Sequence, residues 1–309
     1  MVTSIVPDNN RPLYFLHIHK TAGVTLHAIL DSFFAPEEVL PAIQWHQFFG
    51  TRPEQRAQCK LIRGHFHYCV HEVLDRKPVY ITMLRDPVSR TISRYFHCKR
   101  DVLHYLNPLA HNMTLAEFIR HPITRPQVQN LQTRHIAWDF DIRTLAAQSP
   151  ETILKPWYLE ERINGMLKEL PDEADHALLE KAKQRLGEFA WVGLVERFAH
   201  SIALLTHTFC WQPLSEIQHL NVAPETLRAN EIDRETLAEI KRLTWADQDL
   251  YEYGCQLFKK RYAHMLRESS ECSSKQAFPC SGRGGFLQYV PGIGPALNAL
   301  RRITKTTKD

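Results

Sequence analysis

One stretch near the start of the chain, PLYFLHIHKTAGVTLHAIL at residues 12–30, most limits what this sequence can fold into. Residues 13–18 form a short run of apolar, aromatic and β-branched side chains, which is typical of a buried strand. A polar turn, HKTAGVT, follows, and apolar residues then return at helical spacing as Leu26, Ile29 and Leu30. The sequence therefore predicts a strand, a loop and a helix in this order.

The predicted loop has the composition of an anion-binding site. The first turn of a helix exposes unpaired backbone N–H groups and carries a partial positive charge. Lys20 adds a full charge, Gly23 allows close approach of the backbone, and the hydroxyls of Thr21 and Thr25 can donate to phosphate or sulfate oxygens. An ordinary strand-to-helix turn with a surface lysine would show the same sequence features. This loop alone therefore does not distinguish an anion-binding site from such a turn.

A second stretch, VYITMLRDPVSRTISRYF at residues 79–96, repeats this design. Its first six residues are almost all apolar, which suits a strand buried on both faces of a parallel sheet. Arg85 ends that strand, Asp86 suits a helix N-cap, and Pro87 suits the first helical turn. Ser93 lies eight residues after Arg85, two turns into the helix, so both can bind one anion.

Two strands that each lead into a helix imply an α/β fold. Such strands form a parallel sheet with right-handed crossovers, and ligands bind in the crevice at the carboxyl ends of the strands. We therefore expect a P-loop-like parallel sheet flanked by helices, with both anion sites at one edge. Further strands are predicted at residues 60–62 and 189–195, and helices at residues 114–120, 127–137, 151–187 (broken at Pro171), 196–209, 233–242 and 244–267.

The two loops carry a family resemblance. HIHKTAGVT resembles the 5′-phosphosulfate loop of sulfotransferases that use 3′-phosphoadenosine-5′-phosphosulfate (PAPS). LRDPVSRTISRYFH resembles their 3′-phosphate motif, in which a serine follows an arginine by eight residues. The residues of the two motifs are most similar to those of the carbohydrate sulfotransferases, particularly the heparan sulfate 6-O-sulfotransferase-like group and its bacterial relatives. The resemblance covers residues 12–134 well, and VGLVERF at residues 192–198 more loosely.

This resemblance implies a sulfotransferase fold and a reaction. PAPS would donate a sulfuryl group, by in-line transfer, to an acceptor hydroxyl on a carbohydrate, leaving PAP as product; a lipid-linked sugar or a small alcohol would need the same chemistry. The cofactor-binding residues it implies are Lys20, Thr21, Ala22, Gly23, Val24, Thr25, Arg85 and Ser93. Close relatives often have glycine and threonine where this chain has Ala22 and Val24, so one hydroxyl contact is lost.

The predicted reaction needs a base and a group that neutralises the leaving oxygen. Lys20 suits the second task because charge develops on the phosphate oxygen. A histidine with a pKa near 6.5 suits the first. His65 is the predicted base, since it follows the second strand and the family places its base in a matching stretch. His67 is the main rival and Glu72 a weaker one.

Two other segments are candidates for the walls of the site. Residues 31–56 are rich in proline and aromatic residues, and such insertions often wall a binding site, although the same residues can cover a core. The phrase NLQTRHIAW at residues 130–138 resembles a family segment that lines the active-site cleft. It predicts polar contacts from Gln132, Thr133 and Arg134, with an exposed helix as the alternative.

Histidine pairs invite a metal interpretation. The chain has 17 histidines, among them His17 with His19, and the set His65, His67 and His71. Zinc sites usually combine such pairs with cysteine or carboxylate in a recognisable spacing, and none is present here. We therefore expect no metal.

Charge, cysteine usage and the chain ends set outer limits. Lysine and arginine number 38 against 34 acidic residues, a bias too mild for a nucleic-acid-binding protein. The seven cysteines form no CxxC pair, which favours free thiols. The N-terminus lacks the pattern of a signal peptide, and no stretch suits a transmembrane segment, so we expect a cytoplasmic enzyme. The predicted organisation is a sulfotransferase domain at residues 1–267 and a linker with an accessory C-terminal tail at residues 268–309.

Two other classes of function remain open at this point. A P-loop nucleotide phosphotransferase shares the strand, loop and helix, but the pattern GxxxxGK[ST] is missing and Lys20 precedes Gly23. A non-catalytic anion- or glycan-binding module would keep the cleft without turnover. The combination of Lys20, His65, Arg85 and Ser93 argues against that module.

Overall fold

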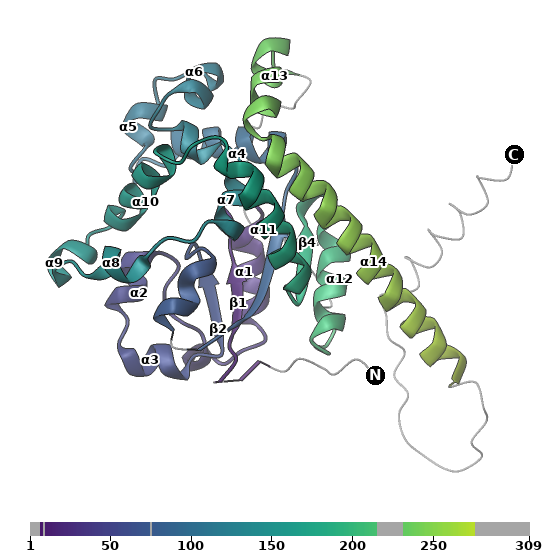
Figure 1. The fold of residues 1–309 in the computed structure, drawn as a ribbon. Helices are drawn as coiled ribbons and strands as arrows, with labels where there is room; N and C mark the ends of the chain where they lie inside the picture. The colour runs from purple at the N-terminus through teal and green to yellow at the C-terminus, as the bar shows by residue number, and fades with distance from the viewer. Residues whose placement is uncertain (1–6, 9, 75, 215–230, 276–309) are drawn as a thin grey trace, which may run out of the picture.

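A computed structural model describes residues 7–8, 10–74, 76–214 and 231–275 (Figure 1). Its centre is a four-stranded sheet in the order β2-β1-β3-β4. All neighbouring strands run parallel, and Leu13 lies opposite both Leu61 and Val79. The α/β parallel-sheet prediction is confirmed. The strands are β1 (Leu13–Leu16), β2 (Leu61–Gly64), β3 (Val79–Leu84) and β4 (Trp191–Leu194).

The strands form because their side chains are apolar on both faces. Every residue of β1, β3 and β4 is buried, as is usual for a parallel sheet covered by helices on both sides. Thr82 is the polar exception in β3, and its hydroxyl donates a hydrogen bond of 2.8 Å to the carbonyl oxygen of Leu16 in β1. A polar side chain inside the sheet is therefore satisfied by the neighbouring strand.

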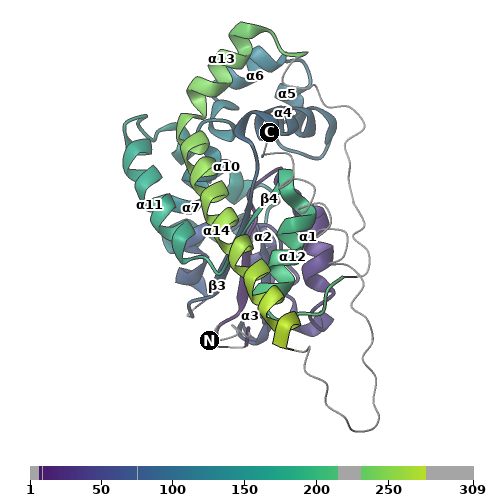
Figure 2. The ribbon, with the colours of Figure 1, turned by 90° about the vertical axis from the view of Figure 1, so that its right-hand side faces the viewer.

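Helices cover both faces of the sheet, and α14 crosses it beside β4 (Figure 2). The helix α7 packs on α11 on one side, while α12 packs against β4 on the other (Figure 2). The helices are α1 (Gly23–Asp31), α2 (Trp45–Gly50), α3 (Pro53–Gln58), α4 (Pro87–Arg100), α5 (Asn107–Ala110), α6 (Leu115–Arg120), α7 (Leu131–Ala137), α8 (Ile142–Ala146), α9 (Pro150–Ile153), α10 (Tyr158–Lys168), α11 (Ala174–Glu188), α12 (Phe198–Thr208), α13 (Arg234–Leu243) and α14 (Trp245–Lys275).

Local capping residues explain several helix starts. Asp86 accepts a hydrogen bond of 2.8 Å from the backbone N–H of Ser89, and Pro87 opens α4, as predicted. Thr114 and Glu117 form a capping box at the start of α6. One helical prediction was too long, because residues 127–137 divide into a 3₁₀ turn that ends at Gln127 and the later helix α7.

The C-terminal helix is longer than the helix predicted over residues 244–267. The helix α14 continues to Lys275, eight residues beyond the predicted end of the domain at residue 267. The rest of the predicted accessory tail, residues 276–309, lies outside the described residues. Among the described helices, none combines the length and apolar character that a membrane span requires.

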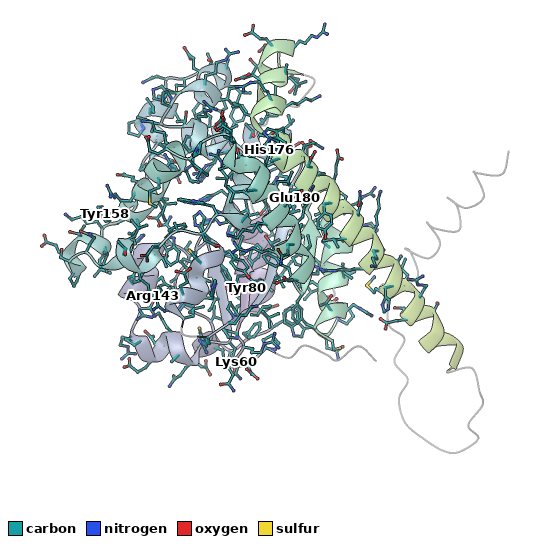
Figure 3. The ribbon with its side chains drawn as sticks, in the orientation of Figure 1. Lys60, Tyr80, Arg143, Tyr158, His176 and Glu180 are labelled. Atoms are coloured by element: carbon teal, nitrogen blue, oxygen red, sulfur yellow. The ribbon has the colours of Figure 1, made fainter. Side chains whose placement is uncertain are left out.

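The main core surrounds the sheet, and a smaller core lies between α4, α5, α6 and α13. Tyr80 of β3 lies within the sheet region in Figure 3 and packs edge-on against Tyr14 at 5.4 Å between ring centroids. Arg143 and Glu180, also labelled there, are exposed on the outside. The buried thiols of Cys59, Cys69 and Cys98 form no disulfide.

Candidate functional site

The two predicted anion loops meet at the carboxyl edge of the sheet. β1 and β3 are neighbours, and their chains leave toward opposite edges, which makes this the topological switch point. Arg85, at the end of β3, donates a hydrogen bond of 3.1 Å from Nη1 to the carbonyl oxygen of Lys20, after β1. One anionic ligand can therefore contact both loops.

The backbone of the first loop has the shape of an anion-binding cradle. Lys20 and Ala22 both have positive φ, at +71° and +58°, an uncommon conformation for residues other than glycine. Among the residues that the structure describes, no side chain caps the N-terminus of α1. Its first N–H groups therefore stay available to an anion. The Thr21 hydroxyl donates to the carbonyl oxygen of Ile18 at 2.9 Å, so it braces the loop. Thr25 is buried in the first turn of the helix, while Val24 is exposed.

Gly23 is required by a neighbouring side chain. A Cβ atom at this position would lie 1.7 Å from Nε2 of His17, much closer than any real contact. The imidazole of His17 therefore packs directly on the backbone of Gly23. The close approach predicted for this glycine is made in the structure by a protein side chain.

The two loops bring several positive charges close together. Burial lowers the pKa of Lys20 to about 8, and the nearby charges of Arg94, Arg85 and Arg100 add to this effect. Burial also lowers the pKa of Arg85, against the opposing effect of Glu196 and Asp86. These cations repel one another without a ligand, so a polyanion such as a phosphosulfate nucleotide fits this site.

The backbone of Arg85 is held by an amide side chain. Gln132 of α7 accepts from the Arg85 N–H at 3.0 Å and donates to the Arg85 carbonyl at 2.9 Å. On the other side, Glu196 accepts from the Asp86 N–H at 2.9 Å. Ser93 lies on α4 with 7% of its surface exposed. Arg85 therefore points from a fixed turn toward the Lys20 loop.

His65 follows β2 and has a defined tautomer. Its Nδ1 lies 2.7 Å from the carbonyl oxygen of His17, which can only accept, so Nδ1 carries the proton and Nε2 is left as a base. Burial lowers the pKa of His65 to about 3. The ring stacks on His19 at 3.7 Å between centroids. His65 is therefore neutral and oriented at physiological pH.

His67 lies beside it in a strained conformation. Its φ of +58° and ψ of −180° fall in a region that is almost restricted to glycine. The ring packs on His135 of α7 at 3.9 Å, and its buried Nδ1 has no hydrogen-bond partner among the described residues. Burial lowers the pKa of His67 to about 3. In contrast to His65, no acceptor fixes its tautomer.

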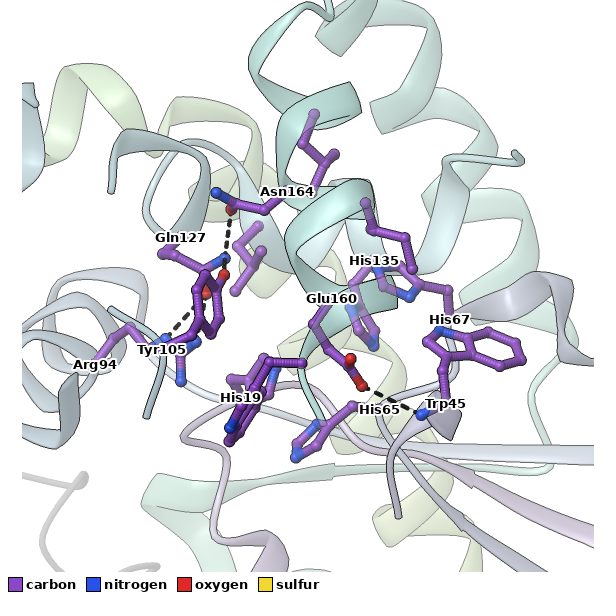
Figure 4. Close-up of a pocket in the computed structure, with 14 residues that line it drawn as sticks. His19, Trp45, His65, His67, Arg94, Tyr105, Gln127, His135, Glu160 and Asn164 are labelled. Atoms are coloured by element: carbon purple, nitrogen blue, oxygen red, sulfur yellow. Dashed lines mark hydrogen bonds between the residues drawn. The ribbon is translucent and has the colours of Figure 1, made fainter. Parts of the chain in front are cut away.

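A pocket joins these histidines to the helices above them (Figure 4). Arg94, Tyr105 and Gln127 lie on one side of this view and Trp45, His67 and His135 on the other, with Glu160 and His65 between them. Trp45 comes from the aromatic insertion that was predicted to wall a site. The lining residues are His19, Trp45, His65, His67, Arg94, Tyr105, Gln127, Leu131, His135, Trp157, Glu160, Ile163, Asn164 and Leu167.

The three predicted cleft residues do not line this pocket. Gln132, Thr133 and Arg134 are all buried, with at most 1% of their surface exposed. Arg134 forms an ion pair of 2.7 Å with Asp175 of α11, and the backbone N–H of Thr133 donates to Asp247 at 2.8 Å. These residues act as structural support for the site, because every residue of the short helix α7 is buried.

Several pocket residues were missed by the sequence interpretation. Glu160, Ile163, Asn164 and Leu167 follow the spacing i, i+3, i+4 and i+7, so they share one face of α10. Glu160 and Asn164 are polar residues on an otherwise apolar helix face, and this pattern in the sequence could have indicated a site. Arg94, next to Ser93, had no such signal.

The histidines near the strand ends lie together as packed rings. Among the residues that the structure describes, no group of three or more histidine, cysteine or acidic side chains has an arrangement suited to a metal ion. Ring packing at the distances given above accounts for the cluster instead.

The parallel sheet, its flanking helices and the basic loops at two adjacent strand ends define an α/β protein with a sulfotransferase-like fold. No protein-family model matches the chain. Curated relatives do match it. Heparan-sulfate 6-O-sulfotransferase 2 of Gallus gallus is 27% identical over 236 residues, covering 66% of this chain and 52% of the relative.

Two human proteins are similar to this chain at nearly the same identity. Heparan-sulfate 6-O-sulfotransferase 1 of Homo sapiens is 28% identical over 228 residues, covering 63% of this chain and 49% of the relative. Heparan-sulfate 6-O-sulfotransferase 3 of Homo sapiens is 28% identical over 241 residues, covering 71% and 45%. The chain is thus similar to curated carbohydrate sulfotransferases, the group that the two motifs resemble. It spans about half the length of these relatives.

Proposed function

We propose that this protein is a PAPS-dependent sulfotransferase that moves a sulfuryl group to an acceptor hydroxyl on a carbohydrate. The observation that carries the proposal is the contact between Arg85 and the Lys20 carbonyl, because it brings two basic loops together at one strand edge beside a neutral histidine. The similarity to named heparan-sulfate sulfotransferases supports the same reaction class.

Each residue has a role in this proposal. PAPS supplies the sulfuryl group and leaves as PAP. The residues of the first loop, from Lys20 to Thr25, hold the 5′ side, and the Lys20 ammonium neutralises charge on the leaving oxygen. Arg85 and Ser93 hold the 3′-phosphate. His65 accepts the proton of the acceptor hydroxyl at Nε2, while the carbonyl of His17 holds Nδ1–H.

His65 is favoured over His67 as the base for a structural reason. A general base needs an unprotonated nitrogen that points in a defined direction. The hydrogen bond at Nδ1 gives His65 both properties, whereas no acceptor fixes the ring of His67.

The proposal is tested by transfer and binding assays on the same variants. Lys20→Ala and His65→Ala should remove most transfer of radiolabelled sulfate from PAPS while the fold survives. A general base typically contributes about 10²- to 10⁴-fold, so His65→Ala should keep a small residual rate. Arg85→Ala should weaken PAP binding by about 10- to 150-fold, the equivalent of a charge-assisted hydrogen bond. Arg234→Ala, at an exposed position that opens α13, is the matched control.

Four outcomes would contradict the proposal or one of its assignments. Unchanged PAP affinity in Arg85→Ala would remove the 3′-phosphate assignment. Phosphoryl transfer from ATP without phosphosulfate would favour a nucleotide phosphotransferase. Tight PAP binding without transfer to any acceptor would favour a binding module. Full loss of activity in His67→Asn, with His65→Asn active, would move the base to His67.

A further inference from the structure

The face of α10 that enters the pocket presents one unsatisfied carboxylate oxygen. Glu160 accepts a hydrogen bond of 3.2 Å from the backbone N–H of Trp45 through Oε1 (Figure 4). Its other oxygen, Oε2, is buried and has no partner among the described residues. A buried oxygen without a donor is costly, and a ligand hydroxyl that donates to Oε2 would remove this cost.

The neighbouring amides are already satisfied. Gln127 donates to Asn164 Oδ1 at 2.6 Å and accepts from Arg94 Nε at 3.1 Å. Asn164 donates to the carbonyl of Ile123 at 3.0 Å. This network holds the pocket wall without reaching toward a ligand. Glu160 Oε2 is therefore the acceptor atom on the α10 face that remains for one.

An aromatic platform lies next to this carboxylate. Trp157, directly before α10, has a φ of +67°, which is a strained conformation for a bulky residue. Its indole N–H donates to the Leu103 carbonyl at 3.1 Å, and its ring lies 5.7 Å from that of Tyr105. Both side chains are half-buried. The hydrogen bond and the ring contact hold the indole at the pocket despite the backbone strain, and strained residues concentrate at ligand sites.

The charge of the pocket is unsuited to a polyanionic acceptor. Arg94 is its one arginine or lysine, and only 1% of its surface is exposed. It is near enough to Lys20 to lower the pKa of that lysine, and its buried Nη1 has no hydrogen-bond partner among the described residues. On the acceptor side the acidic group is Glu160, whose pKa is raised by burial and by the nearby Glu161. A chain with sulfate or carboxylate on each sugar would meet like charge there.

We propose that the α10 side of the pocket binds a neutral sugar ring, with hydroxyls donating to Glu160 and the ring face packed on Trp157, so that the acceptor is an uncharged carbohydrate. This inference rests on the proposed sulfotransferase function. It differs from the heparan sulfate named for the relatives. A carboxylate accepts hydrogen bonds from the hydroxyls of a neutral sugar, and an indole ring packs on the apolar C–H face of that sugar.

The test measures acceptor preference with PAPS in excess. Neutral N-acetyllactosamine oligosaccharides and heparan sulfate are compared at equal sugar concentration, and the neutral sugars should give the higher kcat/KM. Glu160→Gln keeps the shape and the Trp45 contact but replaces Oε2 by a donor. It should raise KM for the neutral acceptor about ten-fold or more, with kcat within about three-fold and PAP affinity unchanged.

Matched variants separate binding from structure. Glu161→Gln makes the same change of charge at the next position, which is exposed and does not line the pocket, and should leave KM for the neutral acceptor unchanged. Trp157→Ala should raise KM and Trp157→Phe should restore much of it, because a ring is kept. A merely structural role would lower kcat and the melting temperature instead.

The outcomes distinguish this inference from the function on which it rests. Transfer that prefers heparan sulfate, or an unchanged KM in Glu160→Gln, would overturn the neutral-sugar site and leave the sulfotransferase intact. Absence of both PAP binding and transfer to every acceptor would overturn the function itself.

Discussion

At the scale of single residues, Lys20 connects the charge and the geometry of the site. Its carbonyl accepts from Arg85, and its ammonium lies among arginines in a buried place that lowers its pKa to about 8. A lysine with a lowered pKa is charged below that value and neutral above it. Its positive charge therefore depends on pH within the range where enzymes are assayed.

This gives a pH prediction for the free enzyme. The kcat/KM for PAPS should be level between pH 6.5 and 7.5 and fall above about pH 8, as Lys20 loses its proton. Lys20→Arg keeps the charge at all these values and should remove the fall, even at a lower absolute rate. A wild-type profile that stays level to pH 9.5 would mean that Lys20 does not hold the donor.

Gln132 is a positioning residue for Arg85, because its amide pairs with the Arg85 backbone on both N–H and C=O. Gln132→Ala removes two hydrogen bonds of about 0.5–1.5 kcal/mol each and should weaken PAP binding by about ten-fold, although the residue is buried. Gln132→Glu keeps the acceptor for the N–H and should lose less. Titration with PAP measures both, and Gln55→Ala on the exposed face of α3 is the control.

The roles of residues that act within their own loop could be predicted from the sequence. The roles of residues that depend on packing against distant parts of the chain could not. Lys20 and Arg85 follow strands, so sequence order alone placed them at one edge. Arg134 has the same charge as Arg85, but the fold encloses it with Asp175, forty-one residues away. No local pattern distinguishes an arginine that binds a ligand from one that binds a distant aspartate.

At the scale of elements, α7 and α11 are joined by that buried ion pair. Arg134 donates to both oxygens of Asp175, at 2.7 and 2.9 Å, and Asn130 donates to the same carboxylate at 2.7 Å. Asp175→Asn leaves a buried guanidinium without its counter-charge and should lower the free energy of unfolding by about 3–5 kcal/mol. Urea denaturation measures the change.

The neighbouring surface pair provides the control for this prediction. Arg125 and Asp172 lie 3.0 Å apart, with side chains 35% and 62% exposed. Arg125→Ala should cost less than about 1 kcal/mol. Equal losses in the two variants would show that burial of the Arg134 pair adds nothing.

Helix starts were easier to predict than helix ends. Asp86 and Pro87 marked the start of α4 correctly, since both act locally on the first turn. The end of α14 was placed too early, because the serine-rich segment after residue 267 looked like a linker while the helix continues to Lys275. Serine and glutamate tolerate a helix, and that segment contains neither proline nor glycine before Lys275.

At the scale of the whole molecule, burial of neutral histidines makes the fold sensitive to acid. Burial lowers the pKa of His17, His19, His27, His65, His67, His97, His104 and His135. In the unfolded chain each would titrate near pH 6.5. Below that pH the unfolded state binds more protons than the folded state, so stability falls as the pH falls.

The melting temperature should therefore drop between pH 6.5 and 5, before most carboxylates titrate. Each buried histidine contributes about 1.4 kcal/mol of lost stability per pH unit once its unfolded form is protonated. His27→Asn removes one such group and should flatten the slope. Calorimetry from pH 7.5 to 5 checks this, and a constant melting temperature over that range would refute it.

The contact between His17 and Gly23 restricts how this protein can change over evolution. Because the imidazole fills the space of a Cβ atom, alanine at position 23 requires either a shift of the His17 ring or a smaller residue at position 17. The backbone carbonyl of the same residue 17 orients His65, so a shift of the backbone there would also move the ring of His65. The first strand, its loop and the catalytic candidate are thus inherited as a unit, and an engineer who transplants the loop into another scaffold must transfer the histidine with it.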